Sequence, residues 1–521
     1  MASKAQNSSS SDISSIPNSP SKFSKIIDYL WPVERHELPK FLFLTLLMFC
    51  ILGIQNLIRA MKDSVINTMI GTETIAFLKF WGVLPAAFLV TIIYVKLVSV
   101  MKGENIFYLI MSVFLSFFAL FAFVLFPNYQ YLQLDPVYAK NLVLLYPNFK
   151  WFILLLSNWS FSLFYIIAEL WPNAIFALLF WQFVNKITTI DESKRFYPLF
   201  GLLGQTGLYL SGQFLVNLVR MNDYVTKSFA LVYDNKSVVS IQIVITVVSI
   251  LGIIALGAFW VINHKILDIT TTENLQFRVK KNQLSLKESF KMIVKSRYIR
   301  LITLLLFCYG VAINLVEGPW KAEATKIYTN PTDFAVFVGN YISYTGILTL
   351  IFVVIGSNIV RRLGWLSAAI ITPFMVLITG MLFFMISNFK PIAGFAMVFF
   401  VLTDPVMIAI IIGAIQNVLS KASKYTLFDS TKEMSYVPLN EELKTRGKAA
   451  ADMIGTKLGK SSSAFLQSML FVIIPTATYQ SVSSFLMIVF CIICIVWIWA
   501  VVELNKEYKN LCKDKKEESI F

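Results

Sequence analysis

Residues 41–60 read FLFLTLLMFCILGIQNLIRA and contain a single charged side chain, Arg59. About 20 such residues in a helix cross the roughly 30 Å hydrocarbon core of a bilayer. The same composition continues along the chain, since 57% of the 521 residues are hydrophobic and only 14% are charged. Soluble proteins carry about 25% charged residues. The sequence therefore indicates a polytopic membrane protein and argues against a soluble enzyme.

Apolar runs of this kind predict an all-α fold with twelve transmembrane helices. The run 152–184 is too long for one straight span, and we expect Pro172 to kink it. The predicted spans are 41–60, 75–95, 106–126, 152–184, 197–219, 238–262, 299–319, 334–359, 366–387, 391–419, 462–477 and 480–502.

The basic residues are concentrated in every second loop along the chain. The chain has 45 Lys and Arg residues against 30 Asp and Glu, a formal net charge of +15. Most of the basic residues fall in alternate loops and in the two tails, and basic loops face the cytoplasm. We therefore expect a multi-pass membrane protein with both termini cytoplasmic.

The longest basic loop divides the chain into two halves of six spans each. We expect a polar cytoplasmic tail at 1–40, a first half at 41–263, a central loop at 264–298, a second half at 299–503 and a charged tail at 504–521. Within the central loop, 284–297 has the pattern of an amphipathic helix on the anionic leaflet. Such duplication is typical of secondary transporters.

A short internal sequence repeat supports the duplication. Asn56-Leu57-Ile58 near the end of the first span corresponds to Asn314-Leu315-Val316 near the end of the seventh, and charged residues follow each triplet.

A few ionisable residues fall inside or at the ends of the spans, where a charge near the bilayer centre costs about 2.5–3.5 kcal/mol. Glu169 and Glu317 lie in apolar surroundings, Arg59 and Lys62 share one helix face, and Lys321 follows Glu317 by one turn. Asp404 precedes Pro405 in the tenth span; it and the other charges could also be structural ion pairs or snorkelling side chains. If these charges are functional, they predict a carrier with a charged central cavity for an anion.

Motifs for other chemistry are absent from the sequence. There is no P-loop or dinucleotide-binding signature, and the two His residues, His36 and His264, argue against a His-built metal site. We expect no cofactor and no nucleic-acid partner. The spacing of Cys491 and Cys494 in an apolar run favours packing over redox chemistry.

Several segments resemble the ATP:ADP antiporter family, the nucleotide transporters of plastids and obligate intracellular bacteria. They are Arg59-Ala-Met-Lys62-Asp63, Ile167-Ala-Glu169-Leu-Trp171, Lys194-Arg-Phe-Tyr-Pro-Leu-Phe-Gly201, Leu315-Val-Glu317-Gly-Pro-Trp-Lys321, Tyr425-Thr-Leu-Phe-Asp429, Lys432-Glu-Met-Ser-Tyr-Val-Pro438 and Lys444-Thr-Arg-Gly-Lys-Ala-Ala-Ala-Asp452. The resemblance covers roughly residues 25–505.

The resemblance implies a major-facilitator-like fold and nucleotide exchange by alternating-access antiport, and it favours the inner membrane of a bacterium over a plastid envelope. It also implies that Lys62, Glu169, Glu317 and Lys448 bind the substrate. The further residues expected to bind or gate are Asn56, Arg59, Asn314 and Lys321. Pro172 and the pair Gly318-Pro319 depart from the family pattern beside proposed site residues, which leaves the base selectivity open.

Two other functions remain open at the level of sequence. One is a proton-coupled transporter of another solute, in which Glu169 or Glu317 would carry the proton. The other is a membrane scaffold that uses the basic segment between spans ten and eleven. The favoured hypothesis is a monomeric carrier, not an enzyme, whose partners are nucleotides and the lipid bilayer.

Overall fold

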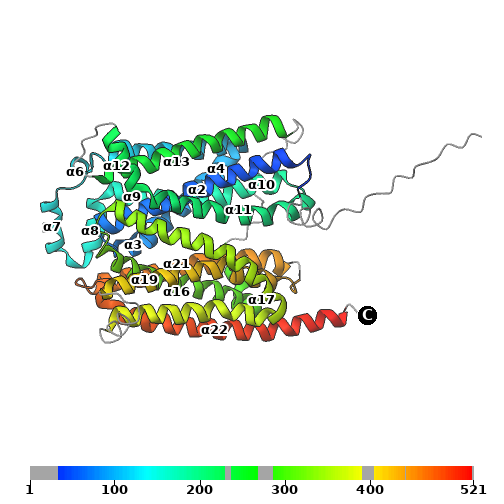
Figure 1. Ribbon diagram of the computed structural model, residues 1–521. Coiled ribbons are helices and arrows are strands. Elements are labelled where there is room, and N and C mark those ends of the chain that lie inside the picture. Colours follow the sequence, from blue (N-terminus) through cyan, green and yellow to red (C-terminus); the bar gives the residue numbers. More distant parts are fainter. Residues whose placement is uncertain (1–32, 229–235, 268–285, 390–403, 441, 519–521) are drawn as a thin grey trace, which may run out of the picture.

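The computed structural model describes residues 33–228, 236–267, 286–389, 404–440 and 442–518, and these ranges are helical without any strand. The helices form two bundles that lie side by side (Figure 1). Helix α2 (Leu38–Met69) begins, and α22 (Tyr479–Glu518) ends, on the same face of the molecule. We call this the terminal face and the opposite one the far face.

The first bundle, the N-terminal half, runs from α2 to η5. Asp135 caps α7 by accepting hydrogen bonds from two backbone N–H groups, and Thr189 forms a capping box with Glu192 at the start of α11. After α2, its elements are α3 (Thr74–Phe77), η1 (Leu78–Val83), α4 (Leu84–Val100), α5 (Gly103–Leu120), η2 (Phe121–Leu125), α6 (Tyr129–Leu132), α7 (Pro136–Leu145), η3 (Pro147–Phe149), α8 (Lys150–Ser157), α9 (Trp159–Trp171), η4 (Pro172–Phe180), α10 (Trp181–Ile187), α11 (Ile190–Val216), α12 (Leu218–Ser228), α13 (Lys236–Val261) and η5 (Ile262–Ile266).

The second bundle, the C-terminal half, is preceded by α15 (Leu286–Lys295) and ends with α22. Its other elements are α16 (Arg297–Thr325), α17 (Pro331–Asn388), α19 (Pro405–Ser423), η6 (Lys424–Phe428), α20 (Asp429–Tyr436), η7 (Leu443–Gly447) and α21 (Lys448–Ile473). Helix α17 contains two passes that meet at Gly364, whose φ of 79° lies in the left-handed region that favours glycine.

Ten of the described helices are long and apolar enough to span a membrane. Helices α11 and α21 have 27 and 26 residues and lie among them, but they are more polar and fall outside this set. The prediction of an all-α polytopic protein is confirmed, and the arrangement is consistent with twelve passes. Pro172, where a kink was predicted, is the residue at which α9 gives way to the π-helical turn η4.

Two of the predicted boundaries were wrong. The start of the predicted tenth span, 391–419, lies outside the described residues, and the helical segment continues past 419, through the π-helical turn η6, to Tyr436. Asp404 is not inside the span, because its side chain caps α19 by accepting from the backbone N–H of Val406 at 2.9 Å. Helix α21 begins at Lys448 instead of 462. Both segments contain Lys residues that resemble loop charge in sequence but lie within helices.

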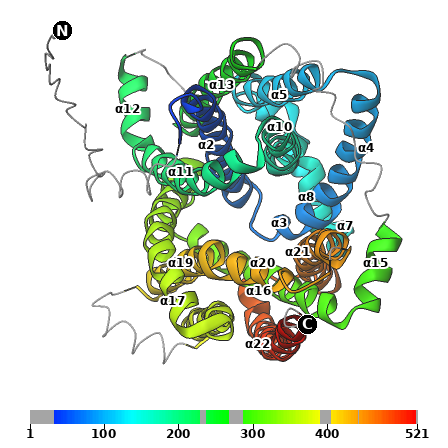
Figure 2. The same ribbon diagram turned by 90° about the vertical axis from the view of Figure 1, so that its right-hand side faces the viewer.

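Helix pairing repeats between the halves. Helix α2 packs against α9, α11 and α13, and its counterpart α16 packs against α19, α21 and α22. Between the halves, α11 packs against α17, and α21 packs against α3 and η1. Viewed from the terminal face, the helices surround a central region to which α2 and α16 both contribute (Figure 2). This pairing agrees with the duplication that the sequence predicted.

Candidate transport site

Lys62 lies at the centre of a buried ion-pair network. Its side chain is 4% exposed, and its Nζ lies 2.8 Å from Oδ1 of Asp63 and 2.9 Å from Oε2 of Glu169. The ammonium group also lies 4.0 Å from the ring centre of Tyr165, within the range of a cation–π contact. Helices α2 and α9 therefore present two carboxylates to one lysine.

Lys321 of α16 extends this network across the two halves. Its Nζ lies 2.8 Å from Oδ2 of Asp63 and 2.9 Å from Oε1 of Glu317. Lys79 of η1 crosses the boundary in the opposite direction, donating to Asn314 Oδ1 at 2.6 Å and lying 3.5 Å from Oε2 of Glu317. Three lysines thus share three carboxylates, and two of the lysines reach a carboxylate in the other half.

A small pocket lies beside this network, lined by side chains from both halves. The Tyr479 hydroxyl donates to Gln467 at 2.7 Å, and the Tyr479 backbone N–H donates to Glu73 Oε1 at 3.1 Å. The ring of Tyr479 occupies the space over Gly318, where a Cβ would lie 2.6 Å from it. This explains why glycine follows Glu317 here. The lining residues are Ile75, Ala76, Lys79, Asn314, Glu317, Gly318, Lys321, Ala464, Gln467 and Tyr479.

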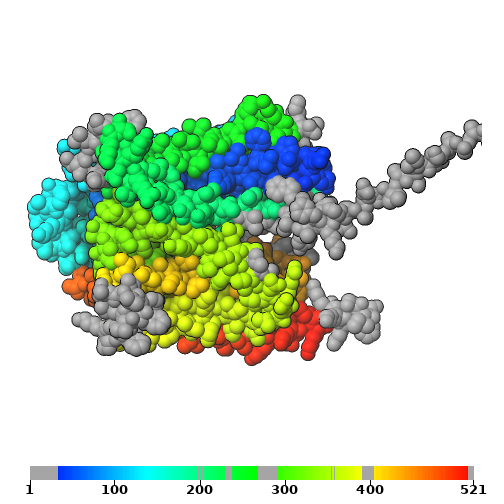
Figure 3. Space-filling model, in the orientation of Figure 1, coloured from blue at the N-terminus to red at the C-terminus, as the bar shows by residue number. Residues whose placement is uncertain are grey.

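The described contacts between the halves gather from the central network toward the far face. Asn148 donates to the carbonyl of Val472 at 2.8 Å, and Gln213 donates to Ser343 at 3.1 Å. At Gly212, a Cβ would lie 2.7 Å from the Gly339 carbonyl oxygen, so α11 and α17 meet almost backbone to backbone. Figure 3 shows the surfaces of these helices joined along the seam between the bundles.

Toward the terminal face, polar side chains of the central region remain accessible. Lys460 and Tyr425 are exposed and Arg59 is partly exposed. The ion pairs Lys40–Glu192 and Lys448–Glu433 on this side each lie within one half. The site is thus closed toward the far face and accessible from the terminal face.

Three cations near the network lack a carboxylate partner among the described residues: Arg59, Lys421 and Lys460. They come from α2, α19 and α21, and electrostatic interactions connect Arg59 with both of the others and Lys460 with Glu169. Lys421 is 9% exposed and donates to the hydroxyl of Tyr341. In this region six cationic side chains share three carboxylates, which leaves a formal excess of three positive charges.

The structure brings most of the predicted site residues together. Lys62, Glu169, Glu317, Asn314 and Lys321 belong to the network, and Arg59 lies beside it.

Asn56 and Lys448 take no part in the described network. Asn56 is buried on α2, seven residues before Asp63. Lys448 lies at the start of α21, where it pairs with Glu433, which also pairs with Lys432 at 3.0 Å.

Sequence reasoning did not select four of the residues found here: Asp63, Lys79, Lys421 and Lys460. Asp63 was visible beside Lys62, and its charge in a continuous apolar helix was the available signal. Lys421 and Lys460 had been assigned to a basic loop, because polar helices that face other helices do not have an apolar pattern.

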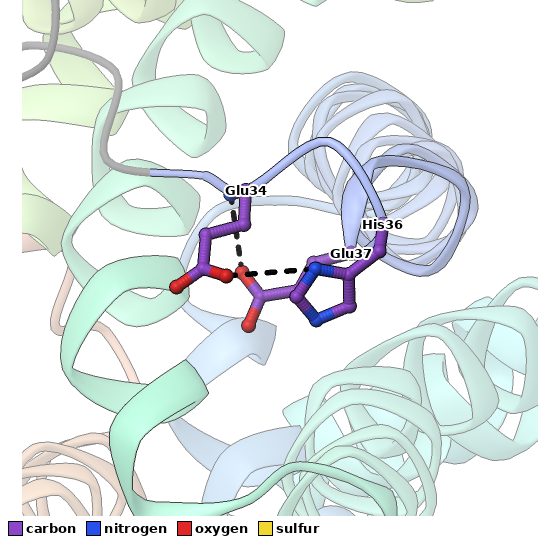
Figure 4. Close-up of side chains that lie close together, drawn as sticks. All are labelled: Glu34, His36 and Glu37. Atoms are coloured by element: carbon purple, nitrogen blue, oxygen red, sulfur yellow. Dashed lines mark hydrogen bonds and ion pairs between the residues drawn. The ribbon is translucent and has the colours of Figure 1, made fainter. Parts of the chain in front are cut away.

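A second group of acidic and His residues, Glu34, His36 and Glu37, lies at the start of α2 (Figure 4). Their potential ligand atoms lie within 4.8 Å of one another. Arg195 of α11 forms ion pairs with both carboxylates, and His36 is exposed. The guanidinium group already binds an oxygen of each carboxylate, so we interpret this cluster as a contact between the start of α2 and α11, not as a metal centre.

Comparison with known proteins decides the family. A family model described as TLC ATP/ADP transporter matches residues 16–508. The chain belongs to the TLC ATP/ADP transporter family. The family resemblance identified from sequence is therefore confirmed, as is the prediction that this family member is a membrane transporter and not an enzyme.

Relatives of this TLC family member match over almost the whole chain. The chain is 67% identical over 504 residues to a protein named ADP,ATP carrier protein 4 from Rickettsia felis. The aligned residues cover 96% of this chain and 98% of the relative. The chain is 44% identical over 500 residues to ADP,ATP carrier protein 3 from Rickettsia bellii, with 94% and 99% covered.

Solved transporters share the fold of this TLC family member at low sequence identity. A bacterial homologue of the iron transporter ferroportin, in an inward-facing state, has a TM-score of 0.59 at 13% identity and covers 91% of this chain and 99% of its own. A D-xylose-proton symporter has a TM-score of 0.54 at 14% identity, with 90% and 97% covered. These likenesses confirm the predicted major-facilitator-like fold.

Proposed function

We propose that this TLC family member exchanges nucleotides across the membrane by alternating-access antiport. The observation that carries the proposal is the excess of positive charge at the boundary between the two halves. Phosphate groups form strong, charge-assisted hydrogen bonds with Lys and Arg. The names of the relatives, ADP,ATP carrier proteins, agree with an anionic nucleotide as the substrate.

In this proposal, the network that contains Lys62, Glu169 and Glu317 has two roles. It binds the phosphate groups of the substrate, and it controls the opening of the far face. A phosphate that enters from the terminal face competes with the carboxylates for the lysines. Release of Lys321 from Asp63 breaks a bond between the halves, and the halves then rock to open the far face.

The same network favours exchange over one-way transport. Without substrate, each of the three lysines already has a carboxylate partner, and the far side is held closed. A substrate that replaces these contacts lowers the barrier to reorientation, because the lysines keep anionic partners throughout. Opposing gradients of two nucleotides drive the cycle, and no hydrolysis is needed.

We also propose that the terminal face is cytoplasmic and that the carrier is a monomer of the bacterial inner membrane. The basic residues of the loops and tails support this orientation through the positive-inside rule. Helix α15 and the end of α22 lie at this face (Figure 2), and Lys291 of α15, Arg297 at the start of α16 and Lys513 near the end of α22 are exposed.

Counterflow in proteoliposomes tests the function directly. Vesicles loaded with unlabelled ADP should accumulate labelled ATP or ADP, and efflux should be slow into buffer without nucleotide. A panel of adenine, guanine and pyrimidine nucleotides would define the selectivity. Transport that depends on a pH gradient but not on internal nucleotide would favour a proton-coupled carrier. Folded protein without flux of any nucleotide would contradict the proposal and favour a scaffold.

A further inference from the structure

Of the three cations that lack a carboxylate partner among the described residues, Lys460 is exposed, whereas Arg59 is partly exposed and Lys421 is buried. Arg59 has no hydrogen bond or ion pair among the described residues, although it is close enough to interact electrostatically with Tyr341, Glu169 and Glu317. Lys421 has only the hydroxyl and the ring of Tyr341, whose centre lies 4.6 Å from its Nζ.

The surroundings of Lys421 do not fit a snorkelling side chain. It is only 9% exposed, and its ammonium group lies against the hydroxyl and the ring of Tyr341 instead of in solvent. A buried ammonium group needs an anionic partner to offset its desolvation.

The nearby carboxylates do not supply this partner. Asp63 is held by Lys62 and Lys321, and Glu317 by Lys321 and Lys79. Arg59 and Lys421 also repel each other, since they interact electrostatically with the same sign. The chain therefore places two uncompensated cations from opposite halves on the accessible side of the network.

We infer that Arg59 and Lys421 form a second phosphate subsite beside the Lys62 network, which takes one part of the substrate's phosphate chain while another part competes for the lysines of the network. The inference rests on the proposed function and assigns a place to the anion within that site. The planar guanidinium group can bind two phosphoryl oxygens at once, and the ammonium group adds a point charge. Tyr341 orients Lys421 through its hydroxyl while the subsite is empty.

Because the two cations come from α2 and α19, a phosphate chain between them would join the halves. This contact would replace the Asp63–Lys321 bridge when the far side opens. The subsite therefore also explains how substrate could hold the halves together during reorientation.

The experiment measures binding to the purified full-length carrier in lipid nanodiscs. The probes are ADP, adenosine, pyrophosphate and inorganic phosphate, and the variants are Arg59→Gln, Lys421→Met and Lys421→Arg. The control is Lys326→Met, because Lys326 lies near the far face and pairs with Glu323 at 2.6 Å. Thermal unfolding of the empty carrier is measured for each variant.

We expect Arg59→Gln and Lys421→Met to weaken binding of ADP and pyrophosphate about ten- to a hundred-fold, as for loss of one charge-assisted bond. Lys421→Arg should restore part of this loss, and Lys326→Met should have no effect. Any adenosine binding should not change. The empty variants should unfold at the same or a higher temperature than the wild type, since an unpaired buried charge is removed, whereas a purely structural role predicts a lower one.

The remaining outcomes separate this inference from the proposed function. Binding of pyrophosphate or phosphate, but not ADP, that depends on Arg59 and Lys421 would support the subsite for an inorganic anion and contradict nucleotide transport. If the wild type binds ADP and the folded variants bind it with the same affinity, the subsite would be wrong and the proposed function would stand. A wild type that binds none of the anions would overturn both.

Discussion

Asp63 of α2 and Lys321 of α16 form an ion pair of 2.8 Å between the first helices of the two halves. Both side chains are buried, with 7% and 6% exposed. Asp63 also holds Lys62, and Lys321 also holds Glu317. This single bridge therefore connects the charges of the transport site to the closure of its far side.

Asp63→Asn should loosen that closure. The substitution keeps the size of the side chain but removes the charge that holds Lys62 and Lys321, and breaking one partner of a buried ion pair typically costs about 3–5 kcal/mol. We expect faster efflux into nucleotide-free buffer and a lower ratio of exchange to efflux. Asp63→Glu, which keeps the charge, should retain more of the coupling. An unchanged ratio in folded Asp63→Asn would show that the bridge does not gate.

Glu169→Gln and Glu317→Gln test whether the central carboxylates act in transport. Each variant deletes one charge from the network while keeping a hydrogen-bonding side chain. We expect exchange per folded molecule to fall in both. If the ion pairs only held helices together, the amount of folded protein would fall in step with transport. Normal specific activity in both variants would contradict a role in the cycle.

Substitutions at Lys62 and Lys448 compare how much each lysine contributes to the apparent affinity for substrate. Lys62 lies in the network, and Lys448 pairs with Glu433 near the terminal face. Lys62→Ala should weaken apparent affinity about ten- to a hundred-fold, with partial recovery in Lys62→Arg. In the conformation described here, Lys448→Ala should have the smaller effect. Equal losses, measured by counterflow at varied substrate concentration, would place Lys448 in the substrate path during another step.

Gly212→Val tests the close approach of α11 and α17. A side chain at this position would collide with Ser343 and the Gly339 carbonyl oxygen. The substitution should destabilise the state that is closed at the far face and should increase labelling of a cysteine placed at Gln467 by a reagent added from that side. Gly257→Val is the matched control, because no atom lies within 4 Å of a Cβ there. Equal labelling in the two variants would argue against closure by this contact.

Orientation can be tested with cysteines at exposed positions. After removal of Cys491 and Cys512, which are partly exposed, a cysteine at Lys291 or Lys513 should react only with reagent in the cytoplasm. A cysteine at Tyr131, which is 88% exposed near the far face, should react only from outside. The reverse pattern would invert the proposed topology.

Much of the fold followed from residues that lie in continuous apolar helices. Stretches such as 41–60 and 480–502 must cover a bilayer core, so the all-α character of the protein and the place of its most apolar helices could be predicted from composition. Prediction failed at α21 and at the end of the tenth span. These helices face other helices and the site, and a Lys inside them cannot be distinguished in sequence from a Lys in a loop.

For the candidate site, too, some residues could be predicted from the sequence and others could not. Lys62, Glu169 and Glu317 could be selected from sequence, because a charge in an apolar run is costly and needs a partner. The class of protein, its most apolar helices and several buried charges therefore follow from the residues along the chain. Which charges meet depends on the folded structure, because Asp63 and Lys321 are 258 residues apart and their contact depends on how the two bundles pack. The same packing left Arg59 and Lys421 without carboxylates, because the nearest acids already hold other lysines.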